Sequence, residues 1–237
     1  MTSHDASARK PNYGLDAPKV VLNLALVDIA CLALGLAWRA ARTPLVFQGL
    51  AFLAMAGVML WGSYFGKRRL RDQILESIPW RGDERVLDVG CGHGLMLIGA
   101  AKRVPSGRAV GIDIWSQEDQ KSNSVAATLE NARREGVAGR IEVVNADMRK
   151  IPFPDNSFDV VLSSFAVHNL YDRAQREQAL REIARVLKSG GRLVIADIRH
   201  VPEYERCLRR LDWIELERRG TSYLFVIPTR TLHAVKP

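Results

Sequence analysis

Cysteine is scarce in this chain, and its three cysteines, Cys31, Cys91 and Cys207, are spread over 237 residues. Their separation gives neither a disulfide framework nor the paired spacing of a zinc site, so we expect no bound metal. Internal repeats and low-complexity linkers are lacking as well. The length leaves room for one α/β domain and an appendage.

The chain also lacks any recognised DNA- or RNA-binding module, although its net charge is +8. Acidic residues alternate with the basic ones, as in residues 205–219, ERCLRRLDWIELERR. Such mixing is typical of a solvated face and not of a basic patch that contacts phosphates. We therefore expect no nucleic-acid partner.

What the chain does contain is a pair of long apolar runs near its N-terminus. Val20–Trp38 and Leu45–Gly66 each hold about twenty residues and few polar side chains, and a short basic segment separates them. A helix of about twenty residues crosses a bilayer core of roughly 30 Å. The sequence therefore predicts a transmembrane hairpin over residues 19–66.

Two other interpretations of the apolar runs are open. A cleaved signal peptide is disfavoured because Trp38 and Arg39 spoil a small-residue cleavage site and a second apolar run follows. A soluble hairpin that covers the ligand site is favoured by Asp28, since a carboxylate at mid-membrane costs a few kcal/mol. Two runs of this length are nevertheless hard to bury against so small a domain. In a membrane, we expect Asp28 to face the partner helix, Asn23 or a second protomer of a homo-oligomer.

Basic residues predict the orientation of the hairpin. They lie just before the first apolar run and just after the second, whereas the connecting loop holds only Arg39 and Arg42. By the positive-inside rule, both termini and everything after the hairpin should be cytoplasmic. The chain would then be an integral membrane protein.

Residues 67–80 read as a basic amphipathic helix beside the membrane. Leu70, Ile74 and Ile78 recur at helical spacing within it. The helix either packs on the following domain or holds that domain against anionic lipid headgroups. The polar residues 1–18 are expected to form a mobile tail.

The most informative stretch is Val86–Ala100, VLDVGCGHGLMLIGA. An apolar strand pattern that contains Asp88 runs into Gly90, Gly92 and Gly94, and a helical pattern follows. Glycine lets the backbone turn sharply and approach a ligand with no Cβ in the way. The ligand is expected at a helix N-terminus, at the carboxyl end of a strand.

Asp113 lies about twenty residues after the last of these glycines, at the end of a second strand pattern. An acid at this offset can accept hydrogen bonds from both hydroxyls of a ribose, although it can also be an ordinary turn residue. The glycine spacing is G-x-G-x-G and not the G-x-G-x-x-G of dinucleotide sites, and no Lys-Ser or Lys-Thr pair marks a P-loop.

This pattern resembles motif I of the class I S-adenosylmethionine-dependent methyltransferases. The resemblance covers residues 81–237 and implies a Rossmann-like, seven-stranded α/β sheet with helices on both faces and one antiparallel strand. It implies S-adenosylmethionine as the cofactor, with the motif glycines against its methionine part. Asp88, the three glycines, Asp113 and Ile114 are then cofactor-binding residues.

A later segment resembles the part of this family that borders the adenine. It follows a predicted third strand and holds Asp147 and Met148. The resemblance places Asp147 to accept from the adenine amine and Met148 to pack on the ring. Asp147 could instead merely cap a turn.

Residues 151–170, IPFPDNSFDVVLSSFAVHNL, resemble the ubiquinone/menaquinone C-methyltransferase group. Ser164 matches the serine with which that group contacts the cofactor. The group carries Arg-Asn where this chain has His168 and Asn169. This departure leaves the acceptor open and does not tie it to a demethylated quinone.

His168 is the candidate for acid–base chemistry. A histidine with a near-neutral pKa can take a proton from a phenol, hydroxyl or amine, and it can equally hydrogen-bond a loop or line the cofactor pocket. Tyr171, Asp197 and His200 are weaker candidates. Methyl transfer asks little of the protein beyond placing the acceptor and excluding water, because a sulfonium is already activated.

The remaining pattern predicts the helices and strands that follow the second strand. We expect helices over Asp119–Glu135, Asp172–Leu187 and Pro202–Leu211, the second ended by Gly190, and strands over Phe158–Leu162, Arg192–Asp197, Trp213–Arg218 and Ser222–Ile227.

Together these features predict a membrane-anchored, S-adenosylmethionine-dependent methyltransferase. Its acceptor would be a lipophilic small molecule that arrives laterally from the bilayer, such as a phenol or quinone-like ring, a lipid or a hydrophobic xenobiotic. A nicotinamide oxidoreductase is opposed by the glycine spacing and by the lack of a Tyr-x-x-x-Lys pair. A membrane-tethered, non-catalytic cofactor sensor or scaffold is the other rival, because methyl transfer has no obligatory catalytic side chain.

Overall fold

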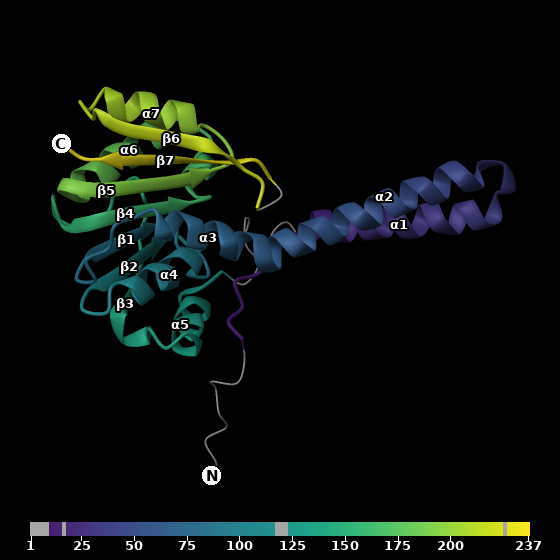
Figure 1. Ribbon diagram of the computed structural model, residues 1–237, viewed down its shortest axis with the longest axis horizontal. Helices are drawn as coiled ribbons and strands as arrows, with labels where there is room; N and C mark the ends of the chain where they lie inside the picture. The colour runs from purple at the N-terminus through teal and green to yellow at the C-terminus, as the bar shows by residue number, and fades with distance from the viewer. Residues whose placement is uncertain (1–9, 16–17, 117–122, 225–226) are drawn as a thin grey trace, which may run out of the picture.

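A computed structural model describes residues 10–15, 18–116, 123–224 and 227–237. These residues form a helical hairpin and an α/β domain, and the hairpin extends from one end of the domain (Figure 1). The connection between the two parts decides how the edge of the sheet is placed relative to the hairpin.

The hairpin consists of α1 (Pro18–Ala37) and α2 (Arg42–Trp61), joined by the 3-10 turn η2 (Arg39–Ala41). Both helices are long and apolar enough to cross a membrane, judged by length and composition alone. Only 17% of each apolar window is buried inside the protein. A hairpin that covered a soluble site would bury most of this apolar surface, so the packing disfavours that alternative.

Asp28 is the buried acidic residue of α1. It is 7% exposed and faces α2, where a Cβ on Gly49 would lie 3.2 Å from Oδ1 of Asp28. The lack of a side chain at Gly49 therefore leaves room for the carboxylate between the two helices. Of the three neighbours predicted for Asp28 in a membrane, the structure places the partner helix beside it.

The second helix continues into the domain without a loop. α2 passes into the π-helical turn η3 (Gly62–Gly66) and then into α3 (Lys67–Glu76), which ends four residues before the predicted boundary. The apolar side chains predicted for one face, Leu70 and Ile74, belong to the core of the domain. Packing on the domain, the first of the two predicted roles, is therefore what α3 does.

The basic residues of α3 make contacts inside the protein. Lys67 is 6% exposed, and its ammonium, like the guanidinium of Arg68, donates to backbone carbonyls of residues 11–14. The guanidinium carbon of Arg69 lies 6.0 Å from the centroid of the Trp61 ring. These contacts leave fewer charges free for lipid headgroups than the sequence predicts. They also hold residues 10–15 of the tail against the domain.

Seven strands form one sheet in the order β3-β2-β1-β4-β5-β7-β6, and β7 is antiparallel to both of its neighbours. The Rossmann-like sheet with one antiparallel strand is thus confirmed. The strands are β1 (Arg85–Val89), β2 (Arg108–Asp113), β3 (Ile141–Asn145), β4 (Phe158–Ser164), β5 (Leu187–Asp197), β6 (Glu215–Ser222) and β7 (Thr229–Val235).

Helices cover both faces of the sheet (Figure 1). Successive residues of a strand point to opposite faces, so Val86 joins the apolar core on one face and Leu87 the core on the other. The first face is covered by α3, α4 (Leu95–Arg103) and α5 (Val125–Arg134), and the second by α6 (Arg173–Val186) and α7 (Val201–Arg209); η4 (Ala138–Arg140) and η5 (Val167–Asn169) are short turns.

The predicted helix Asp172–Leu187 is confirmed to within one residue at each end, but its termination by Gly190 is wrong. The helix stops at Val186, and β5 begins at once at Leu187. Gly190 has φ +73° and donates its N–H to the Lys236 carbonyl at 2.8 Å. Its left-handed conformation therefore serves the pairing of β5 with the C-terminal segment and does not cap a helix.

The closing hairpin is also shifted. The predicted strand Ser222–Ile227 is wrong, because β6 extends to Ser222 and β7 begins only at Thr229. β7 lies along the whole apolar half of β5, with Asp197 opposite Arg230. Pairing with a central strand, which is not visible in the local pattern, sets this register.

The predicted start of a helix at Asp119 lies in residues 117–122, outside the described residues. The described helix α5 begins at Val125. Ser124 caps it, since its hydroxyl oxygen accepts the Ala127 N–H at 3.2 Å.

The hairpin meets the domain at Gly66. A Cβ there would lie 1.7 Å from the carbonyl oxygen of Leu224, just after β6. Only glycine permits so close a contact. Because β6 runs in the same direction as β1 to β5, the carboxyl ends of all these strands face the base of the hairpin (Figure 1).

Gly66→Ala should therefore destabilise the protein. The new Cβ forces the Leu224 backbone away, and overpacking of this kind costs about 1–3 kcal/mol. The thermal unfolding midpoint of the detergent-solubilised protein should fall by several degrees. Gly57→Ala in α2 is the matched control, because no atom lies within 4 Å of a Cβ at Gly57. Equal midpoints for the two variants would contradict the contact.

Candidate functional site

The predicted ligand-binding residues gather at the edge of the sheet where β1 to β5 end. The strand order reverses between β1 and β4, which are neighbours in the sheet. Open α/β sheets bind their ligands in the crevice outside the carboxyl ends of the strands, at such a reversal. Gly90 follows β1 and Ala166 follows β4, so both lie at this point.

The glycine turn has a left-handed backbone at each motif glycine. The φ angles are +76° at Gly90, +49° at Gly92 and +84° at Gly94, a region that other residues adopt only with strain. The N–H groups of Gly90 and Cys91 both donate to the Ile112 carbonyl, at 2.8 and 3.1 Å. The turn is thereby fixed to the end of β2.

The turn is also packed too closely for side chains at two of these positions. A Cβ on Gly90 would lie 2.3 Å from Cβ of Ala166 and 3.8 Å from Cε of Met148. A Cβ on Gly94 would lie 2.8 Å from Cγ2 of Thr128. The structure thus brings together the glycine turn, Met148 and the start of the loop that carries the candidate histidine.

Two buried polar residues of α5, missed in the sequence, hold the turn from outside. The Thr128 hydroxyl donates to the Gly92 carbonyl at 2.6 Å, and Nδ2 of Asn131 donates to the His93 carbonyl at 3.0 Å. The spacing of Thr128 and Asn131 puts both on one helix face. Both are polar residues on a helix face that is predicted to be buried, and this feature of the sequence could have identified them.

Asp113 ends β2 with its carboxylate against the turn. Oδ2 accepts the Gly92 N–H at 2.8 Å, while Oδ1 accepts the Trp115 N–H at 2.7 Å and lies 3.4 Å from Nδ2 of Asn123. Each carboxylate oxygen has two lone pairs, so Asp113 can still accept from ligand hydroxyls. Ile114, beside it, is 61% exposed at the rim of the site.

Asp88 is the buried acid of the site. Among the described residues, neither of its carboxylate oxygens makes a hydrogen bond of standard geometry, although the nearby Leu97 backbone acts to lower its pKa. Burial, with an added effect of the Asp113 charge, raises the pKa of Asp88 to about 7. A buried carboxylate without a partner suits a cationic ligand group, which would offset its desolvation.

Asp147 follows β3 and Ser164 ends β4, at the same edge of the sheet but with β2 and β1 between the two strands. The guanidinium of Arg149 binds both carboxylate oxygens of Asp147, and this hydrogen bonding lowers the pKa of Asp147. An adenine amine would have to share that carboxylate with Arg149. Ser164 ends β4 opposite Ala196 of β5 and is half-buried.

His168 lies against the buried carboxylate of Asp197. Nδ1 of His168 is 2.5 Å from Oδ1 of Asp197, and the His168 backbone N–H donates to Oδ2 at 3.2 Å. Asp197 also accepts from the Tyr204 hydroxyl at 3.1 Å, and burial together with this acid raises the pKa of Tyr204. Two residues that the sequence offered as separate candidates therefore form a pair.

Arg176, which sequence reasoning missed, fixes the other side of the His168 loop. It is buried, and Nη1 donates to the carbonyls of Leu170 and Tyr171 at 2.7 and 2.9 Å. The same guanidinium makes two 3.0 Å hydrogen bonds to the Glu203 carboxylate of α7. An arginine inside an amphipathic helix carries no sequence sign that distinguishes it from its exposed neighbours.

The two other weak candidates lie outside the His168–Asp197 pair. The Tyr171 residue is 91% exposed. His200 begins α7 with φ +61°, and its Nδ1 is 3.6 Å from an oxygen of Glu203.

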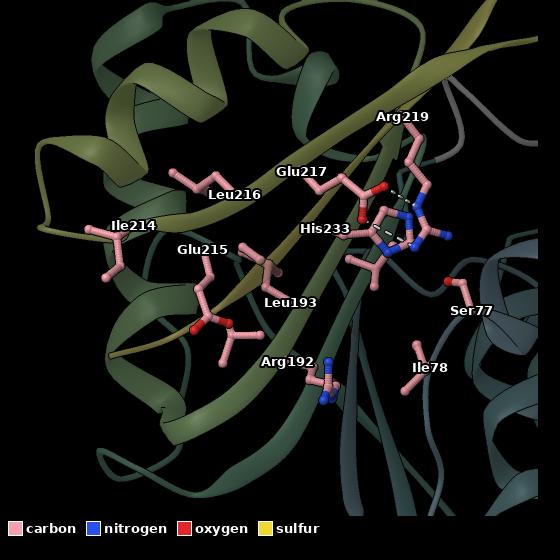
Figure 2. Close-up of a pocket in the computed structure, with 13 residues that line it drawn as sticks. Ser77, Ile78, Arg192, Leu193, Ile214, Glu215, Leu216, Glu217, Arg219 and His233 are labelled. Carbon is pink, nitrogen blue, oxygen red and sulfur yellow. Dashed lines mark hydrogen bonds and ion pairs between the residues drawn. The ribbon is translucent and has the colours of Figure 1, made fainter.

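A groove of about 420 Å³ lies elsewhere, between α3 and the strands β5, β7 and β6 (Figure 2). Arg219 and Glu217, both on β6, are hydrogen-bonded to each other along one side of it, beside His233. Burial, with a further effect of Arg219, lowers the pKa of His233 to about 4, so its imidazole is neutral near pH 7. None of the predicted site residues lines this groove, so it is not the cofactor site.

The strand-end residues fit the sulfonium cofactor predicted from the sequence. The glycine turn is a cradle that a Cβ would fill, Asp88 offers an orphaned buried carboxylate to a cationic group, and Asp113 retains acceptors for hydroxyls. Within residues that the structure describes, no group of three His, Cys, Asp or Glu side chains could hold a metal ion.

A family model described as a methyltransferase domain matches residues 87–195. The chain is 34% identical to the 27-O-demethylrifamycin SV methyltransferase of Amycolatopsis mediterranei, over 56% of this chain and 46% of that protein. It is 37% identical to the ubiquinone/menaquinone biosynthesis C-methyltransferase UbiE of Geobacter sulfurreducens, over 55% of this chain and 48% of that protein. The chain thus spans about half the length of these curated relatives.

Solved structures share the fold at lower identity. A methyltransferase from Aquifex aeolicus, described as S-adenosylmethionine-dependent, has a TM-score of 0.53 at 24% identity, over 70% of this chain and 89% of that chain. The cyclase SpnF has a TM-score of 0.60 at 22% identity, over 72% of this chain and 80% of that chain. At these identities the likeness shows the fold and not the reaction.

The raised pKa of Asp88 predicts a pH-dependent stability. Because folding raises this pKa from 3.8 to about 7, the stabilisation is complete below about pH 4 and is lost as the pH rises through 7. Without cofactor, the free energy of unfolding should fall by roughly 2–3 kcal/mol between pH 5 and pH 8, whereas Asp88→Asn should remove this dependence. Chemical unfolding at each pH measures the free energy of unfolding of the wild-type protein and of Asp88→Asn. If the two free energies change with pH in parallel, the raised pKa of Asp88 is contradicted.

Proposed function

We propose that the chain is a membrane-anchored methyltransferase that methylates a lipophilic small molecule, on the premise that the domain after the hairpin is a class I S-adenosylmethionine-dependent methyltransferase domain. We propose further that the acceptor is a hydroxyl, as on a phenol, and that it reaches the site from the bilayer.

The hairpin supports the membrane part of this proposal. Its apolar side chains are exposed, Trp38 is exposed at its tip, and Trp61, Tyr64 and Phe65 are exposed at its base. Aromatic side chains at both ends of an apolar span are typical of membrane–water interfaces. The excess of basic residues on the base side favours a cytoplasmic methyltransferase domain.

The direction of the sheet supports lateral entry of the acceptor. The strand ends that carry the glycine turn and the His168 loop face the base of the hairpin, where Gly66 contacts Leu224 (Figure 1). In the proposed placement, this edge lies nearest the bilayer surface. A molecule dissolved in the bilayer would then have a short path to the site.

The pair of His168 and Asp197 is the observation that carries the chemistry. Nδ1 lies against the Asp197 carboxylate without a hydrogen bond of standard geometry, so Nε2 is the nitrogen proposed to take a proton. The contact with the buried carboxylate holds the ring in place. Such a pair is useful to an acceptor that must lose a proton as it is methylated, which favours a hydroxyl over an already nucleophilic group.

The other residues bind and orient. When bound, S-adenosylmethionine supplies a methyl group already activated on its sulfonium sulfur, and the sulfur keeps the electron pair of the broken bond. The glycine turn, Asp88 and Asp113 would hold the cofactor at the ends of β1 and β2. Arg176 fixes the backbone beyond His168, so the base keeps its position relative to the turn.

The names of the relatives fit a lipophilic acceptor of this general kind. One is named for a demethylated rifamycin and the other for ubiquinone and menaquinone biosynthesis. This chain has His168 where the quinone group has arginine, which supports methylation at oxygen over methylation at a ring carbon.

Membranes of cells that express the chain should convert methyl-labelled cofactor into label that extracts into organic solvent. His168→Gln should lower the rate at saturating cofactor by about 10²–10⁴-fold, because the general base is lost. The affinity for the cofactor, measured by isothermal titration, should stay unchanged. His200→Gln is the matched control and should keep the wild-type rate.

The outcomes separate the rival functions. Label bound to protein would show a protein acceptor, and cofactor binding without any labelled product would support the non-catalytic sensor or scaffold. Either result contradicts the proposal. A His168→Gln variant with the wild-type rate would overturn the role of the histidine alone.

Thiol labelling tests the proposed topology. A cysteine at the hairpin tip, Ala40→Cys, should react with a membrane-impermeant maleimide in intact cells. Arg218→Cys on β6 should react only after lysis, because its strand is cytoplasmic in the proposal. The wild-type chain measures the background from its three native cysteines. Labelling of Arg218→Cys in intact cells would contradict the orientation.

A further inference from the structure

Residues 10–15, called the strap from here on, dock between α3 and α5. Five consecutive carbonyl oxygens of the strap accept hydrogen bonds from side chains of these two helices. The donors are Arg134 to Lys10 (3.3 Å), Arg68 to Pro11 (3.3 Å), Asn131 to Asn12 (2.8 Å), and Lys67 to Tyr13 (2.9 Å) and to Gly14 (2.6 Å). An irregular surface segment normally gives its carbonyls to water, so the two helices form a dedicated binding site for the strap.

The strap is anchored in the core as well as by its backbone. Tyr13 is 4% exposed and belongs to the same apolar cluster as Leu70 of α3. Its hydroxyl donates to the Glu135 carboxylate at 3.0 Å, and Glu135 also pairs with Lys102 of α4. The strap therefore links three helices that cover one face of the sheet.

Asn131 connects the strap to the glycine turn. Its Oδ1 accepts the Asn12 N–H at 2.8 Å, and its Nδ2 donates both to the Asn12 carbonyl and to the His93 carbonyl. A second contact is steric, since a Cβ on Gly14 would lie 3.4 Å from the His93 ring. His93 stands between Gly92 and Gly94, so the strap packs on the middle of the turn.

We propose that the strap is part of the cofactor site and that Asn131 is the positioning residue through which it acts. The docked strap forms two hydrogen bonds with the side-chain amide of Asn131, and this amide donates a third to the backbone carbonyl of His93 within the turn. This inference rests on the proposed use of the glycine turn to bind S-adenosylmethionine. It adds that affinity for the cofactor depends on the strap and on Asn131. These residues contact the turn at His93 and do not lie at the edge of the sheet where the ligand is proposed to bind.

The coupling must be reciprocal. If strap docking raises the affinity for the cofactor, cofactor binding tightens the docking of the strap by the same factor, with a typical coupling of about 5- to 150-fold. Because α1 begins at Pro18, shortly after the strap, the same contacts would tie cofactor binding to the position of the hairpin.

Lys67 allows the strap to be loosened without touching the turn. In the full-length protein, Lys67→Met removes the donor to the Tyr13 and Gly14 carbonyls. We expect the dissociation constant for S-adenosylmethionine, from isothermal titration, to rise about 5- to 50-fold. Lys67→Arg keeps a donor and should recover most of the affinity. Arg69→Met is the matched control on the same helix, since Arg69 contacts Trp61, and it should bind within about twofold of wild type.

Two further measurements separate positioning from general damage. In steady state, Lys67→Met should raise KM for the cofactor and leave kcat nearly unchanged. In a double-mutant cycle, Lys67→Met should add little to Asn131→Ala, because both interrupt one chain of contacts. In the wild-type protein, saturating cofactor should slow hydrogen exchange at the Asn12 amide, a readout that needs no variant to fold.

Wild-type affinity in Lys67→Met, additive effects in the cycle, or an Asn12 amide that does not respond to cofactor would overturn the inference while leaving the proposed function intact. Failure of the wild-type protein to bind the cofactor at all would instead overturn the proposed function. Raised KM, non-additivity and slowed exchange together would support the strap as part of the site.

Discussion

The backbone between β1 and α4 passes through the left-handed region at three of five consecutive residues, and much of the domain is arranged to hold it there. β2 binds its amides through the Ile112 carbonyl, and Asp113 accepts the Gly92 N–H. Ala166 closes against Gly90 from the side of β4, while α5 holds two of its carbonyls. The glycine turn is thus fixed by contacts from β2, from the segment after β4 and from α5, and these contacts do not depend on a ligand.

Much of this arrangement could be predicted from the sequence, because local patterns encode it. The spacing of Gly90, Gly92 and Gly94 after an apolar strand predicts the turn, and an acid at the end of the next strand predicts Asp113 beside it. The parallel part of the sheet follows from alternating strand and helix patterns. The antiparallel β7 and the strand order followed only from family resemblance.

What could not be predicted depends on contacts between residues far apart in the chain. The register of β7 is set by β5, so the closing hairpin was placed several residues too early. Asp197 and His168 were each visible, but their pairing depends on two neighbouring strand ends. Lys67 looked like a charge for lipid headgroups because a sequence does not show that backbone carbonyls of residues 13 and 14 will surround it. Buried polar groups of this kind stand out only once the helices are packed.

The helix from Arg39 to Glu76 runs for 38 residues from the tip of the hairpin into the core of the domain, roughly 57 Å at the usual rise. In the described chain no loop separates α2, the π-helical turn η3 and α3, and Gly66 within η3 packs against the Leu224 carbonyl beside the sheet. In the proposed membrane placement, the reacting edge therefore stays at one height above the bilayer. The rate of such an enzyme would follow the mole fraction of acceptor among the lipids, so that adding inert lipid slows it by surface dilution even when the bulk concentration is constant.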